Sequence, residues 1–171
     1  GELTMGTMKV QQLYKTEPLK CWEKAKELRV KHYRDVVSAK KEGKILSSGS
    51  MEAITELIAG FGDHIHMASE PYGATIGSDP EFSRQCVEAL ESRGYARDLC
   101  AYTRNYLGSV LINRYYFGGK FPKPDFCFQS HSCESHGKWL QAASEIMGVP
   151  YFCIDMPLAP HGLRLESRVE Y

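Results

Sequence analysis

Two segments with the pattern strand, helix, strand constrain the fold of this chain more than any other feature. They occupy residues 44–68 and 125–155, and in each an apolar segment leads into an amphipathic one and then a second apolar segment. Parallel strands need a crossover connection of this kind, usually a helix. The sequence therefore predicts an α/β fold, a flavodoxin- or Rossmann-like parallel sheet flanked by helices. Strands are expected at 44–48, 64–68, 125–129 and 150–155, and helices at 50–61 and 134–147.

Further helices are expected outside these two units. Residues 18–41 have apolar side chains every three to four positions and are followed by Gly43, which predicts a long N-terminal helix. Two more helices are expected at 81–94 and 96–106, after a loop at 70–79 that is rich in Gly and Pro.

The chain divides into three parts on this pattern. An N-terminal helical segment comprises residues 1–43, an α/β domain residues 44–160, and the start of a connecting helix residues 161–171. The helix-like end, at 163–171, has no stop signal, so we expect one part of a longer polypeptide. Residues 113–124 are aromatic and Gly-rich and are expected to be irregular.

Composition excludes several classes of protein. The chain has 21 basic and 21 acidic residues, and this balance argues against a basic surface for nucleic acid. No apolar run approaches the ~20 residues that cross a membrane. Residues 1–5 lack the layout of a signal peptide, so a cytoplasmic protein is expected. Six cysteines in 171 residues are too few for a disulfide scaffold, and free or metal-bound thiols are expected.

Cys133 lies where the predicted strand at 125–129 gives way to polar residues and then to a helix. Open parallel sheets bind ligands at the carboxyl ends of their strands, so a thiol here is a candidate for chemistry. Cys133 and His136 have a spacing compatible with a zinc ion, although no second closely spaced pair accompanies them. Alternatively, Cys133 is a nucleophile at a helix start, with His131 or His136 as its base. The third interpretation is a position in the core.

Other residues have simpler interpretations. His64 and His66 alternate along a strand, and burial with a satisfied hydrogen bond is expected for them. No phosphate-binding loop is present, so nucleotide binding by this chain is not supported. Four cysteines within predicted strands or helices are expected to be structural, namely Cys21, Cys86, Cys127 and Cys153.

Polar side chains stand at the carboxyl ends of the first two predicted strands. Ser48 and Ser50 occupy this edge after the first strand, and Glu70 follows the second. Helix capping by the serines and a solvated glutamate are the simpler alternatives to ligand binding.

Two cysteine motifs, taken in order, resemble those of a known family. In 97–108, Cys100 is followed by Tyr two residues on, a basic residue four on, and Leu-Gly at seven and eight. In 130–139, Cys133 begins a Cys-x-x-x-x-Lys-Trp motif. Over about residues 40–160 the chain resembles the benzoyl-CoA reductase and 2-hydroxyacyl-CoA dehydratase family, and within it most of all the beta subunits of the reductases.

The resemblance implies an iron–sulfur cluster, a [4Fe-4S] cluster, held by three cysteines of each subunit. Cys100 and Cys133 match the first two, whereas the third belongs to a downstream domain and nothing in this chain matches it. Residues 44–160 would then be the cluster-binding domain. The resemblance also implies that Ser48, Ser50, Glu70 and Ser130 bind substrate. His131 and His136 are candidate catalytic proton donors by location.

The activity implied is low-potential electron transfer to an acyl-CoA thioester. The reductase adds electrons and protons to the aromatic ring of benzoyl-CoA, and the dehydratase makes a ketyl radical that expels the hydroxyl. The implied partners are a homologous sister subunit, an ATP-hydrolysing activator that delivers electrons, and the acyl-CoA substrate. We expect a subunit of a benzoyl-CoA reductase-type enzyme, with an (R)-2-hydroxyacyl-CoA dehydratase subunit as the alternative. A non-catalytic flavodoxin-like binding module is the alternative from another class.

Overall fold

The computed structural model describes residues 17–51 and 55–155 and contains a parallel sheet. Neighbouring strands are parallel throughout, in the order β2-β1-β3-β4. The order reverses between β1 and β3, where sheets of this kind bind ligands. The predicted α/β fold is confirmed. The strands are β1 (Ile45–Gly49), β2 (His64–Ala68), β3 (Phe126–Ser130) and β4 (Tyr151–Ile154).

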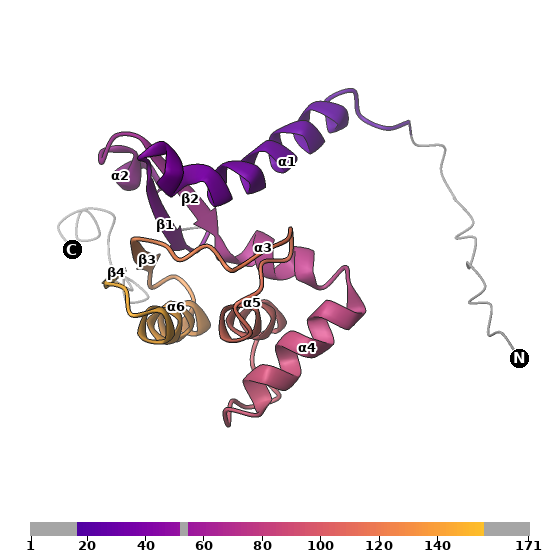
Figure 1. Ribbon diagram of the computed structural model, residues 1–171, viewed down its shortest axis with the longest axis vertical. Helices are drawn as coiled ribbons and strands as arrows, with labels where there is room; N and C mark the ends of the chain where they lie inside the picture. The colour runs from indigo at the N-terminus through magenta and orange to yellow at the C-terminus, as the bar shows by residue number, and fades with distance from the viewer. Residues whose placement is uncertain (1–16, 52–54, 156–171) are drawn as a thin grey trace, which may run out of the picture.

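Helices cover the sheet and extend beyond it. Figure 1 shows α5 and α6 side by side, α2 beside the upper end of the sheet, and α1 projecting away from the body. The described helices are α1 (Trp22–Ser38), the 3₁₀ helix η1 (Ala39–Glu42), α2 (Thr55–Ala59), α3 (Ser69–Ile76), α4 (Pro80–Glu91), α5 (Ala101–Leu111) and α6 (Glu134–Met147). None of the helices in the described residues is both long and apolar enough to cross a bilayer.

Successive residues of β3 serve opposite faces of the sheet. Cys127 belongs to the large core together with Leu46 of β1 and Met67 of β2, and α6 packs over this face. Phe128 packs instead against Ile58 of α2. This alternation follows from the two-residue period of a strand. The sheet therefore separates two apolar layers.

Aromatic side chains build the large core. Tyr72 of α3, Tyr106 of α5 and Trp139 of α6 are fully buried. The ring of Tyr106 meets Trp139 edge-on with centroids 5.3 Å apart, and its hydroxyl lies 2.7 Å from Ser48 Oγ in β1. The Tyr72 hydroxyl lies 2.7 Å from Ser109 Oγ. Burial raises the pKa of both phenols well above the ordinary value, so both stay neutral in the core.

The loop predicted at 70–79 is wrong, because α3 occupies most of it. Pro71 lies in the first turn of this helix, where a missing N–H costs no intrahelical hydrogen bond. Gly73 lies where α3 and α5 approach each other closely. A Cβ there would lie 2.6 Å from the carbonyl oxygen of Tyr102 in α5. Proline and glycine thus mark a helix start and a packing contact here, and neither marks a loop.

The helix predicted at 96–106 is displaced, since α5 runs from Ala101 to Leu111. Cys100 is therefore the N-cap of α5 and lies just outside the helix. The turn before it is held by Glu91, whose Oε1 lies 2.5 Å from Arg104 Nη2 and whose Oε2 lies 3.1 Å from Arg97 Nε. These two contacts link α4 to the turn and to the first residues of α5, and the local periodicity of the sequence does not reveal them.

Other predicted boundaries agree more closely with the structure. The long N-terminal helix is α1 together with η1, and Gly43 ends it with a left-handed φ of 73°. The helix at 134–147 has the predicted bounds. The helix predicted at 163–171 lies outside the described residues, and the division into three parts stays a prediction.

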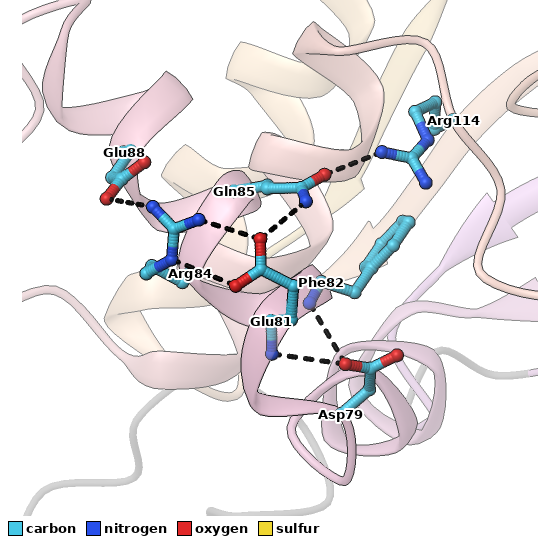
Figure 2. A network of polar contacts seen from close by, with 7 residues as sticks. All are labelled: Asp79, Glu81, Phe82, Arg84, Gln85, Glu88 and Arg114. Atoms are coloured by element: carbon cyan, nitrogen blue, oxygen red, sulfur yellow. Dashed lines mark hydrogen bonds and ion pairs between the residues drawn. The ribbon is translucent and has the colours of Figure 1, made fainter.

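Polar contacts fix α4 at its start and along its exposed face (Figure 2). Asp79 Oδ1 accepts the amide of Phe82 at 3.0 Å and caps the helix. Arg84 pairs with acidic side chains on either side of it. Gln85 Oε1 accepts from Arg114 Nη1 at 2.6 Å. The last contact ties α4 to the segment at 113–124, which has no helix or strand, as predicted.

Gly108, the glycine of the first cysteine motif, lies where α5 approaches α4. A Cβ at this position would lie 2.1 Å from the carbonyl oxygen of Cys86 and 2.5 Å from its Cα. We expect Gly108→Ala to lower the free energy of unfolding by about 1–3 kcal/mol, because backbone must move to admit the methyl group. Urea denaturation measures this change.

Gly137→Ala in α6 is the matched control. A Cβ there would lie 3.6 Å from its nearest neighbour, which is ordinary contact. Alanine in a helix interior is then expected to be neutral or to stabilise by up to about 1 kcal/mol. Equal effects of the two substitutions would contradict the assigned role of Gly108.

Candidate functional site

The carboxyl ends of the strands bring the candidate residues to one edge of the sheet. Met51 follows β1, Glu70 follows β2, and Cys133 follows β3. Asp155 comes directly after β4. Because all four strands are parallel, these positions share the edge at which such sheets bind ligands.

Cys100 and Cys133 occupy equivalent local positions, since each is the N-cap of a helix. Cys133 has an extended backbone, with φ −139° and ψ 132°, whereas Cys100 has a similar ψ of 130° at a φ of −45°. Both side chains are exposed. The free N–H groups at the start of a helix can donate hydrogen bonds to the sulfur of a ligating cysteine. Each cysteine is thus presented to solvent in a setting that suits metal ligation.

The helices that follow these cysteines start at the same edge. α6 begins after the carboxyl end of β3, and α5 packs against α6. A cavity of about 110 Å³ between their first turns is lined by residues of both, among them Thr103 and Ser135. Tyr106 and Trp139, which meet in the core, each lie six residues after their cysteine. The two N-caps therefore lie at the same end of the packed helix pair.

Within residues 17–51 and 55–155, no group of three or more His, Cys, Asp or Glu side chains lies close enough together to hold a metal ion. His136, the proposed zinc partner of Cys133, directs Nε2 to Glu70. Two cysteines alone cannot complete the ligand set of an iron–sulfur cluster. A cluster held by Cys100 and Cys133 would need at least one ligand from outside the described residues.

Buried polar atoms without a hydrogen-bond partner concentrate around this edge. In native proteins such atoms are few, and each calls for an explanation such as a bound group. Within the described part of the chain, all six lie at the edge or in the first two turns of α5 and α6. They are Ser50 Oγ, Glu70 Oε1, Thr103 Oγ1, Arg104 Nε, His136 Nδ1 and Trp139 Nε1. The residues present therefore fit a site that holds a further group beside the two cysteines.

Glu70 contacts residues from three segments at this edge of the sheet. Its Oε2 accepts the amide of Met51 at 2.8 Å and the hydroxyl of Ser69 at 3.1 Å. Its Oε1 lies 3.0 Å from His136 Nε2, and only 13% and 12% of the two side chains are exposed. The simpler alternative of a solvated glutamate is wrong.

The three predicted serines differ in their surroundings. Ser48 Oγ donates to the carbonyl of Met67 at 3.3 Å, so it accepts the hydroxyl of Tyr106 and is engaged in the core. Ser50 is buried and its amide donates to Gln129 Oε1 at 3.1 Å. Ser130 is buried at the end of β3, and its carbonyl accepts from Gln129 Nε2.

His131 is exposed and stands between two carboxylates. Its Nδ1 lies 3.1 Å from Asp155 Oδ1, and its Nε2 lies 3.4 Å from Glu134 Oε2. The hydrogen bonds to Asp155 and then Glu134 raise the pKa of His131 above its ordinary value. Sequence reasoning missed Asp155, although its place at the end of the predicted strand 150–155 was the available signal.

His66 is partly buried with both ring nitrogens engaged, which confirms the predicted hydrogen bonding, whereas His64 is not buried and its Nδ1 lies 3.0 Å from the carbonyl oxygen of Gly62 at an exposed position. Nε2 lies 3.2 Å from the carbonyl oxygen of Ser50 and must donate to it. Nδ1 then accepts from Ser47 Oγ at 2.9 Å. His66 therefore holds the backbone that leads from β1 to the edge.

The remaining cysteines are free thiols. Cys86 and Cys127 are buried, as predicted, and burial raises the pKa of each to about 12. Cys153 is half-buried in β4. Cys21 differs from the prediction, because it is exposed at the N-cap of α1.

Comparison with known protein families matches residues 51–171 to 2-hydroxyglutaryl-CoA dehydratase, D-component. The match covers more than half of the chain. The chain belongs to this dehydratase D-component family. Members of the family carry iron–sulfur clusters, the cofactor that the resemblance implied.

Among curated proteins, this family member is similar to the alpha subunit of (R)-2-hydroxyisocaproyl-CoA dehydratase of Clostridioides difficile. The two are 27% identical over 146 residues, which are 85% of this chain and 35% of that relative. The chain thus spans about a third of the length of this relative. Both comparisons support the dehydratase alternative better than the expected likeness to the beta subunits of benzoyl-CoA reductases.

The pH dependence of stability tests the buried state of His66. Burial lowers its pKa below the ordinary value of 6.5, so below that pH the unfolded chain binds more protons than the folded one. The free energy of unfolding should therefore fall as the pH decreases from above 6.5 through this window, and less steeply in His66→Gln. Urea denaturation at pH 7.5 and 5.5 measures the difference.

His64→Gln, on the same strand, is the control and should keep most of the wild-type pH dependence, because burial is the largest cause of the lowered pKa of His66 and the charge of His64 is a smaller one. His32, whose pKa burial also lowers, is present in all three proteins. Identical slopes for His66→Gln and the wild type would contradict a buried neutral His66.

Proposed function

We propose that this chain forms the cluster-binding part of an (R)-2-hydroxyacyl-CoA dehydratase subunit. The observation that carries the proposal is the placement of Cys100 and Cys133 at the N-caps of two helices that pack together, with Cys133 at the ligand-binding edge of the sheet. Membership of a dehydratase family and similarity to a dehydratase alpha subunit support this substrate class.

A [4Fe-4S] cluster would supply single electrons at low potential. In the proposed reaction, the 2-hydroxyl and a hydrogen on C3 leave as water, so substrate and product are at the same overall oxidation level. The electron that starts each cycle would come from an ATP-hydrolysing activator and be recovered at its end. A sister subunit and the acyl-CoA are the other partners.

The chain's own residues would have distinct roles. Cys100 and Cys133 would hold iron, with the third cysteine supplied from outside the described residues. Ser50, Glu70 and Ser130 would line the substrate side of the edge. Ser48, which was predicted as a further substrate contact, would instead support the edge from the core through its hydrogen bond with Tyr106.

Proton transfer is proposed for the two histidines of the second motif. His131 is exposed at the edge, and its two carboxylate neighbours raise its pKa, which favours a protonated ring. His136 is less accessible, because its Nε2 faces Glu70. We therefore rank His131 first as the donor.

Reduction of benzoyl-CoA is the second candidate, supported by the motif resemblance on residues 97–108 and 130–139. A non-catalytic module is the third, and it predicts a colourless protein whose exposed thiols react freely. An assay of the anaerobically purified full-length subunit with its partners separates them. Dehydration of a 2-hydroxyacyl-CoA is expected, and reduction of benzoyl-CoA alone would overturn the proposal.

Cys100→Ser and Cys133→Ser in the full-length subunit should each lose most of the iron and sulfide and the EPR signal of the cluster. Cys21→Ser is the matched control, since Cys21 is also an exposed thiol at a helix N-cap, on α1. It should retain full iron content. Unchanged iron in either of the first two variants would show that these cysteines are not ligands.

A further inference from the structure

Glu70 and His136 form a buried polar contact between segments that are distant in sequence. Glu70 lies in the first turn of α3 and His136 in the first turn of α6. Glu70 Oε1 and His136 Nε2 are 3.0 Å apart, which is within hydrogen-bond distance. The N–H is not well aligned with the oxygen, so Oε1 has no hydrogen bond of good geometry. The two side chains are nevertheless in direct polar contact, since no water molecule fits between atoms so close.

The contact is the third that this carboxylate makes, and the three have different origins. The Met51 amide comes from the segment after β1, the Ser69 hydroxyl from the start of α3, and His136 from α6. A buried carboxylate that loses one partner is costly, so these contacts hold one another in place. Glu70 thereby fixes the segment after β1 relative to α6.

His136 is held rigidly on the α6 side. Its amide donates to the carbonyl of Cys133 at 3.0 Å, within the first turn. Its ring lies 5.8 Å from that of Trp139, which packs on Tyr106 of α5. A displacement of the His136 ring would therefore disturb the turn that carries Cys133.

We propose that His136 is a positioning residue, which holds the Glu70 carboxylate and thereby sets the segment at Ser50 and Met51 against the turn of Cys133. The inference rests on the proposed function only in treating Cys133 as an iron ligand. Partners that orient ligands in this way typically change metal affinity or activity by about 10–100-fold when removed.

Two amide substitutions separate positioning from general packing. In His136→Gln the side-chain nitrogen is as many bonds from Cβ as Nε2 is, and it can donate to Glu70. In His136→Asn the nitrogen corresponds to Nδ1 and falls short of Glu70. Both variants are polar and smaller than histidine, so they share any loss of packing and differ in reach.

Hydrogen exchange at the Met51 amide in the iron-free full-length subunit is the direct readout. His136→Asn should increase this exchange, whereas His136→Gln should restore it toward wild type at a similar urea midpoint. His64→Asn, at the amino end of β2, is the control and should leave Met51 unchanged. Equal exchange in wild type and His136→Asn would overturn the proposal, as would equal increases in the asparagine and glutamine variants.

Iron loss to a chelator from the loaded enzyme is the second readout. It should be about 10–100-fold faster in His136→Asn than in His136→Gln. Equal loss rates in these variants would remove the link to Cys133. If Cys133→Ser retains its iron, the proposed function fails. The exchange of the Met51 amide still tests the contact between His136 and Glu70 independently.

Discussion

The contact of Tyr106 with both Trp139 and Ser48 is the interaction on which the rest of the site depends. It joins α5 to α6 through two buried rings and α5 to the sheet through a hydroxyl. An aromatic pair contributes about 0.5–1.5 kcal/mol beyond the burial of its area. Because each ring lies six residues after a candidate cysteine, this contact brings the two N-caps to the same end of the helices.

The polar layer above that core has an unusual balance. Its backbone is well supported, since His66 holds the carbonyl of Ser50 and Glu70 accepts the amide of Met51. Side-chain atoms with no hydrogen bond nevertheless gather there, among them Ser50 Oγ and His136 Nδ1. A supported backbone with unsatisfied side chains is what a preformed ligand site needs, because binding can then satisfy the side chains without rearranging the chain.

Much of the fold was predictable from sequence because its strands and longest helices have strong local periodicity. β2 and α6 have the predicted bounds, and the other strands are displaced by about one residue at their ends. The errors at α3 and α5 have a different cause. Gly73 and Gly108 each lie against the backbone of another helix. Glu91 of α4 pairs with Arg97 and with Arg104 of α5. No local sequence pattern encodes these contacts.

The sequence by itself determined the parallel α/β architecture, the order of the two cysteine motifs and the family, because these depend on local patterns and residue identity. The tertiary structure alone decided that Cys100 and Cys133 are the N-caps of two packed helices, that Ser48 is engaged in the core, and that Glu70 faces His136. Strand order and helix packing set these neighbours. The physical reason is that a side chain's partner at a sheet edge comes from whichever strand or helix packs beside it, however distant in sequence.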